Sequence, residues 1–210
     1  MRPVLDPDLY SQPESWYGSY YQLAIEVSLF PADEPLAAAL EALWESPHLR
    51  GPWQDITAPG KPVPLRIPEP GGGVSFYGVL TAGDLGELPC VSHIVRESGE
   101  NADWLSLGIP VNTMLQHGLR DLVYEAPPEL FAPIDRVLLD IGIHVFARAG
   151  FLLAAIGEET SGLHSSATFD ASDTTLDGFL VPKPLWDRVA KLRSAKPVAP
   201  GLKWKPPRIA

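Results

Sequence analysis

The fold is decided by residues 133–159, which read PIDRVLLDIGIHVFARAGFLLAAIGEE. Apolar side chains recur in the first half of this stretch at the three- and four-residue spacing of one helical face. Pro133 suits the first position of a helix, and Gly150 suits a left-handed cap at its end. Residues 151–156 are apolar without alternation, which is typical of a strand buried on both faces. We therefore expect a helix at about 133–149 that leads into a central strand.

The rest of the chain supplies the neighbours of this strand. Residues 21–29 alternate apolar and polar side chains, as a strand with one buried face does. A second helix is expected at about 35–45. Further strands are expected at residues 74–81, 88–97, 104–109 and 176–182. Strands that follow one another, with two main helices placed apart, predict an α+β fold with a mostly antiparallel sheet.

We expect a single α+β domain over residues 1–182. Seven prolines interrupt residues 47–73, and we interpret this segment as a proline-rich covering loop, either a lid or a fixed cover. Residues 183–210 are predicted to form a short helix and a basic, proline-rich C-terminal tail. The pattern leaves open whether this tail packs on the domain or extends from it.

The charge of the chain is unevenly distributed. Residues 183–210 hold eight basic side chains and one acidic side chain, a net charge of +7. Since the whole chain carries −10, residues 1–182 carry −17, because −10 minus +7 is −17. An acidic body favours a protein partner with a basic surface and disfavours nucleic acid, except through the tail. The sequence leaves a homo-oligomer open.

The composition also indicates the cellular compartment of the protein. The single cysteine, Cys90, allows no disulfide within the chain and favours a reducing compartment. The chain has no apolar run long enough to span a bilayer and no apolar leader in its first residues. We therefore expect a cytoplasmic protein without a membrane segment.

Two local patterns resemble parts of metal-binding and phosphate-binding sites, but neither has the sequence context that such a site needs. Cys90 and His93 lie three residues apart in an expected strand, so their side chains point to opposite faces. The glycines of residues 71–73 follow prolines and open a strand, whereas a phosphate-binding loop follows a strand and opens a helix. We expect no metal and no cofactor.

The richest polar cluster follows the buried strand. Glu158, Glu159 and His164 place two carboxylates and an imidazole within seven residues, at the end of a strand where sites often form. These three residues are the catalytic candidates of a small-molecule hydrolase. A strand that ends in charge and a polar turn is also an ordinary structural pattern, so this reading is the alternative.

Aromatic side chains indicate the preferred function. Trp16, Tyr17 and Tyr20 crowd around the start of the first strand, and Trp53 lies in the proline-rich loop. Aromatic residues with polar tips are enriched at binding surfaces, although they also fill cores. With no coherent catalytic set, the sequence favours a binding protein. Its concrete form would be an acidic inhibitor or immunity-type protein that masks a basic partner.

Overall fold

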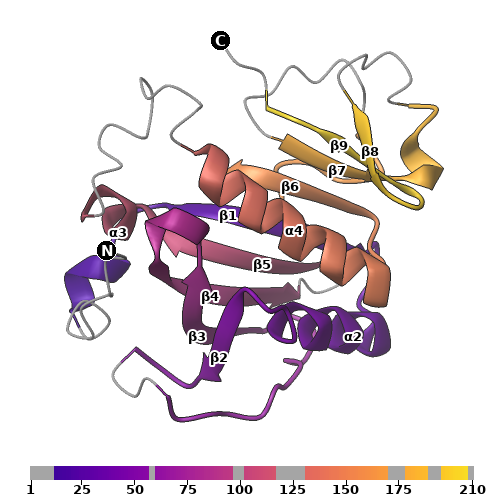
Figure 1. Cartoon of the computed structure of the whole chain (residues 1–210). Helices are drawn as coiled ribbons and strands as arrows, with labels where there is room; N and C mark the ends of the chain where they lie inside the picture. Colours follow the sequence, from indigo (N-terminus) through magenta and orange to yellow (C-terminus); the bar gives the residue numbers. More distant parts are fainter. Residues whose placement is uncertain are drawn as a thin grey trace.

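The computed structural model describes residues 12–56, 60–96, 102–116, 131–169, 178–188 and 195–207. Within these residues the strands form one antiparallel sheet in the order β2-β3-β4-β5-β1-β6-β7-β9-β8 (Figure 1). The strands are β1 (Tyr20–Ser28), β2 (Leu49–Trp53), β3 (Gly73–Thr81), β4 (Glu87–Arg96), β5 (Asp103–Pro110), β6 (Leu153–Glu158), β7 (Gly178–Pro182), β8 (Lys196–Ala199) and β9 (Leu202–Lys205). The predicted α+β class with a mostly antiparallel sheet is confirmed.

The predicted central strand is β6, which lies between β1 and β7. Five of its six residues are buried, because the sheet continues on both sides and both faces are covered. The register places Leu23 of β1 opposite Ile156 and Ile25 opposite Ala154. The amphipathic strand predicted near the N-terminus is therefore the direct neighbour of the apolar strand.

Two helices cover the same face of the sheet (Figure 1). They are α2 (Asp33–Trp44) and α4 (Ala132–Arg148), and they contact each other and β1. The apolar stripe of α4 is buried against this face, as its spacing predicts. A shorter helix, α3 (Val111–Gln116), follows β5. The two main helices are confirmed close to their predicted bounds.

Near β6 and β7, the opposite face is covered by a smaller apolar cluster. Phe169 and Leu185 pack with Leu153 of β6 and Phe179 of β7. Glu26 of β1 is fully buried beside them, and its carboxylate accepts hydrogen bonds from the segment that follows β6. This segment therefore folds back over the sheet.

Three strands were not predicted, and each lies at or next to an edge of the sheet. β2 lies inside the proline-rich segment 47–73, whose later apolar side chains pack against the core. β8 and β9 form a hairpin within the C-terminal segment, and β9 pairs with β7. Proline removes a backbone donor but is tolerated on edge strands, where Pro52 and Pro197 lie. The prolines that argued against strands therefore mark the two edges.

The spacing of apolar residues in 112–122 also predicts a short helix. α3 forms its first part, and residues 117–122 lie outside the described residues. The short helix predicted at 185–192, within the C-terminal segment, is not formed in its described part, where the 3-10 turn η4 (Lys183–Leu185) is followed by a turn at residues 186–188. Among the described residues, no helix combines the length and apolar character needed to cross a membrane.

Candidate functional site

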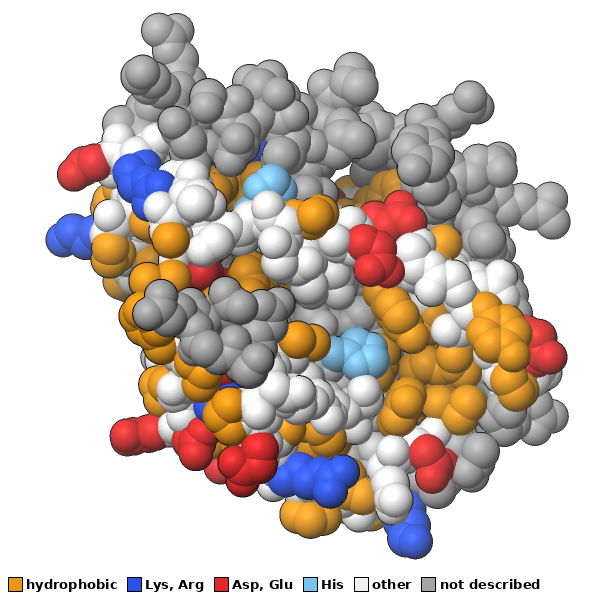
Figure 2. Space-filling model, turned by 180° about the vertical axis from the view of Figure 1, so that it is seen from behind, with side chains coloured by type: hydrophobic (Ala, Val, Ile, Leu, Met, Phe, Trp, Pro, Cys, Tyr) orange, Lys and Arg blue, Asp and Glu red, His pale blue; other side chains and the backbone are white. Residues whose placement is uncertain are grey.

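One face of the sheet lies away from α2 and α4, and we call it the open face (Figure 2). Because Leu23 of β1 points into the core beneath the helices, strand alternation directs Tyr20 to the open face. The register aligns Ser75 of β3, His93 of β4 and Ser106 of β5 in one row on this face. Figure 2 shows hydrophobic and polar side chains gathered together here.

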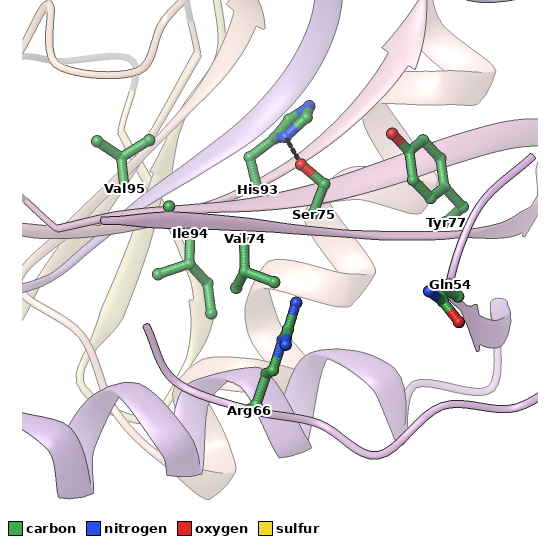
Figure 3. Close-up of a pocket in the computed structure, with 9 residues that line it drawn as sticks. Gln54, Arg66, Val74, Ser75, Tyr77, His93, Ile94 and Val95 are labelled. Carbon is green, nitrogen blue, oxygen red and sulfur yellow. Dashed lines mark hydrogen bonds between the residues drawn. The ribbon is translucent and has the colours of Figure 1, made fainter. Parts of the chain in front are cut away.

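Ser75 and His93 form a cross-strand pair. The Ser75 hydroxyl and His93 Nδ1 lie 2.8 Å apart, so they share a hydrogen bond whose direction depends on the imidazole tautomer (Figure 3). The ring of Tyr20 meets the His93 ring edge to face, with centroids 5.6 Å apart. Three strands thus bring a hydroxyl, an imidazole and a phenol together.

A second aromatic contact continues this group. Trp16 belongs to the 3-10 turn η1 (Pro13–Trp16), and its ring meets Tyr77 of β3 edge to face at 5.2 Å. The turn is held in place because the Thr113 hydroxyl of α3 donates to the Ser15 carbonyl at 2.7 Å. Tyr17 follows directly and is 62 % exposed. We call Trp16, Tyr17, Tyr20, Tyr77 and His93 the aromatic surface.

The four predicted binding residues differ in exposure. Trp16 and Tyr20 are half-buried, and Tyr17 is the most exposed of the four. Trp53 is buried, and together with Val79 it forms the small apolar cluster on which Trp16 packs. The fold therefore brings all four into one region, with Trp53 as support for Trp16.

Burial and neighbouring groups shift the pKa values of two members of the aromatic surface, His93 and Tyr20. Burial lowers the pKa of His93, and the Glu159 carboxylate opposes this effect. Burial raises the pKa of Tyr20, and neighbouring Tyr77 and Glu159 raise it further. Both pKa shifts favour the uncharged forms of the His93 imidazole and the Tyr20 phenol at neutral pH.

The catalytic candidates of the predicted hydrolase have structural contacts. Glu158 accepts a hydrogen bond from the Ser19 hydroxyl. The Glu159 carboxylate accepts one from the Tyr20 backbone N–H at 2.8 Å. His164 packs edge to face on Phe179, with centroids 4.9 Å apart. A hydrolase that uses Glu158 or Glu159 with His164 stays a prediction.

The segment that carries His164 is anchored by the buried Glu26. The Ser165 hydroxyl donates to one carboxylate oxygen of Glu26 at 2.7 Å, and the Ser166 N–H donates to the other at 2.6 Å. A buried carboxylate requires such donors, because desolvation without them is costly. Glu26 thus fixes the loop over β1.

A hollow adjoins the aromatic surface at the edge of β3. Its volume is about 440 Å³, and its lining includes Gln54, Arg66, Val74, Ser75, Tyr77 and His93 (Figure 3). Figure 3 shows Val74 and Arg66 on one side of β3, and Ser75, Tyr77 and His93 on the other. The hollow therefore reaches round the edge of the strand.

Cys90 lies in the core under the helices, on the opposite side of β4 from His93. Burial raises the pKa of the Cys90 thiol well above its ordinary value, which leaves it a poor nucleophile. Among the described residues, no three His, Cys, Asp or Glu side chains gather as metal ligands.

Sequence reasoning did not select Ser75, Tyr77 or His93 as binding residues. Ser75 and Tyr77 alternate with apolar residues in β3, and His93 precedes Ile94 in β4. This alternation places the three side chains on the face opposite the core, and it is the signal in the sequence that could have selected them. Which outward residues meet depends on the pairing of β3 with β4 and of β5 with β1, and this pairing is not visible in local pattern.

The chain matches no protein-family model, no curated protein and no solved structure.

Proposed function

We propose that the protein binds another protein through the aromatic surface. The observation that carries this proposal is the position of Tyr17, which is 62 % exposed and directly follows half-buried Trp16, whose ring contacts Tyr77. Tyr and Trp side chains supply most of the binding energy in many interfaces, since they bury large areas at a small entropic cost. The supporting side chains are already ordered by contacts within the chain.

The partner is proposed to present a basic surface. The whole chain carries −10. The carboxylates of Glu158 and Glu159 flank the aromatic surface, and Glu14 belongs to the same turn as Trp16. Arginine side chains can stack on aromatic faces and pair with nearby carboxylates. In the concrete form of this proposal, the protein is an acidic inhibitor or immunity-type protein that covers a basic site on its target.

The proposal can be tested with a defined probe. An arginine-rich peptide is titrated into the isotope-labelled protein, and chemical shifts and the dissociation constant are measured by NMR at two salt concentrations. Replacement of Tyr17 with alanine should weaken binding by about ten-fold, as for an interface anchor. A glutamate-rich peptide should not shift the resonances of the aromatic surface.

Phe30 provides the matched control, because it is 59 % exposed and lies outside the aromatic surface. Phe30→Ala should bind the arginine-rich peptide like the unmodified protein. Equal weakening by Phe30→Ala and Tyr17→Ala, or shifts spread evenly over the acidic surface, would contradict the proposed function.

A further inference from the structure

Part of β3 has a free edge. β2 pairs with β3 from Leu80 to Tyr77, and among the described residues no strand pairs with the outer edge of residues 73–76. The outer edges of the sheet are different, because β2 contains Pro52 and β8 contains Pro197. Proline protects an edge strand from further pairing, and residues 73–76 contain none.

The direction of the backbone groups follows from the ladder. Arg96 N–H donates to the Gly72 carbonyl at 3.1 Å, so this pair is hydrogen-bonded between β3 and β4. Hydrogen-bonded and non-hydrogen-bonded pairs alternate in antiparallel sheets, so Gly73 and Ser75 direct N–H and C=O away from β4. Thr81 has the same parity, and its N–H donates outward to the His48 carbonyl at 2.8 Å.

The hollow described above lies against this edge, with Gln54 and Arg66 in its lining. Among the described residues neither side chain takes part in a hydrogen bond or ion pair within the chain, and both are exposed. Polar side chains of this kind beside unpaired backbone groups can receive a chain that is added to the sheet.

Gly73 creates a position at this edge that favours a large apolar side chain on an added strand. Val95 lies opposite Gly73 on β4 and is 47 % exposed, since the glycine has no side chain to cover it. A large apolar side chain on an added strand could reach across Gly73 to Val95, as aromatic residues do beside glycines in sheets. On the other side of the strand, Arg66 would meet a carboxylate.

We propose that the partner adds an extended segment to the free edge of β3. The segment alternates an apolar side chain toward Val95 with an acidic side chain toward Arg66. This inference rests on the proposed function, because it describes how the same protein partner engages the region beside the aromatic surface.

The probe is the blocked peptide acetyl-Thr-Glu-Phe-Glu-Thr-amide. Its pattern reads the same in both directions, so it presents phenylalanine opposite Gly73 and threonine opposite Ser75 in either strand orientation. The control peptide carries lysine in place of both glutamates. Binding is followed by NMR, and the amides of Gly73 and Ser75 should show the largest shifts.

Two variants of Ser75 distinguish the contribution of its backbone N–H to peptide binding from that of its side chain. Ser75→Ala keeps the outward N–H and loses the bond to His93, whereas Ser75→Pro also removes the N–H. Ser75→Ala should keep the affinity, and Ser75→Pro should lose about ten-fold, since one partner carbonyl is left without a donor. Equal affinities of these two variants would overturn the inference.

Charge reversal tests the inference without relying on proline. Arg66→Glu should bind the lysine peptide better than the glutamate peptide, by about five-fold for an exposed pair. This variant decides the matter if circular dichroism shows that Ser75→Pro does not fold. An unchanged preference for glutamate, or no shift at the edge amides with either peptide, would overturn the inference.

The two proposals can fail separately. Tyr17→Ala should still bind the glutamate peptide, because Tyr17 does not line the hollow. If the arginine-rich peptide binds at the aromatic surface and the glutamate peptide does not bind, the proposed function survives and the added strand does not. If the protein dimerises in light scattering and Ser75→Pro abolishes the dimer, a second copy occupies the edge and the peptide is the wrong occupant.

Discussion

The Tyr21 hydroxyl on β1 donates a hydrogen bond to Asp135 on α4, with an O···O distance of 2.5 Å. This bond joins the helix predicted from residues 133–149 to the sheet beneath it. The Tyr21 ring also stacks on Phe131, at the start of α4, with centroids 4.9 Å apart. Burial raises the pKa of Asp135 to about 6, although the bond from Tyr21 acts to lower it.

The protein should lose stability as the pH rises from about 4 to about 6, because Asp135 ionises in that window. The pKa of Asp135 is higher in the folded state than its ordinary value of 3.8, so the folded state holds the proton more tightly. Asp135→Asn should remove this dependence, which we expect to be no more than about 2 kcal/mol for a half-buried group. Urea denaturation across this pH range measures it.

Asp140→Asn is the control for this prediction, since Asp140 lies on the same helix with half of its side chain exposed. It should leave the pH dependence in place. A full pH dependence in Asp135→Asn would show that another group is responsible.

His93 should titrate below the ordinary range for histidine, because burial lowers its pKa. The folded-state pKa lies below the unfolded value of about 6.5, so the contribution of His93 to stability falls as the pH drops through that value. Glu159→Gln removes the carboxylate that opposes this shift, so the His93 pKa should fall further. NMR titration of the imidazole measures the change.

Glu158→Gln is the matched control, because Glu158 bonds to Ser19 and is not among the groups that shift His93. It should leave the His93 pKa unchanged. A His93 pKa that does not respond to Glu159→Gln would contradict the electrostatic description of the aromatic surface.

Arg96→Met should be strongly destabilising. Arg96 Nε donates to the Asp103 carboxylate at 3.0 Å, and both side chains are almost fully buried. Asp103 also accepts from the Ala32 N–H at 2.7 Å, just before α2. Loss of the arginine leaves a buried carboxylate without its cation, which costs about 3–5 kcal/mol. Denaturant titration measures this change in the free energy of unfolding.

The exposed pair of Arg50 and Glu87 provides the comparison, with an N···O distance of 2.8 Å. Arg50→Met should cost less than about 1 kcal/mol, because solvent screens an exposed pair. Similar losses for Arg50→Met and Arg96→Met would show that burial of the Arg96 pair is unimportant.

Gly178→Ala should disturb the C-terminal hairpin. A Cβ at residue 178 would lie 2.0 Å from the Trp204 ring, so this ring would have to leave its place over β7. Overpacking of this kind costs about 1–3 kcal/mol. Thermal denaturation should show a lower midpoint for Gly178→Ala, and adding Trp204→Leu should recover part of the loss. No recovery in the double variant would place the strain elsewhere.

Local sequence patterns predicted the helices and strands whose burial is visible in the periodicity of their own residues. The apolar run 151–156 indicated a strand buried on both faces, and the alternation in residues 21–29 indicated a strand with one buried face. The two strands are adjacent, with Leu23 opposite Ile156, but residues 22–27 are buried throughout, so the prediction of a wetter face on β1 was wrong. The aromatic residues near the start of β1 were also selected from sequence. In contrast, β2, β8 and β9 were missed, because their prolines lower strand propensity and the edge position that tolerates proline is a property of the whole sheet.

The sequence by itself determined the class of the fold, the two main helices and the burial of β6, since each follows from periodicity within one segment. Only the tertiary structure decided that Ser75 and His93 face each other and that Glu26 anchors the loop after β6. It alone also showed that no strand in the described part of the chain pairs with the outer edge of residues 73–76. These relationships join residues far apart in the chain. Their register is chosen by the packing of the complete sheet, so no local pattern records them.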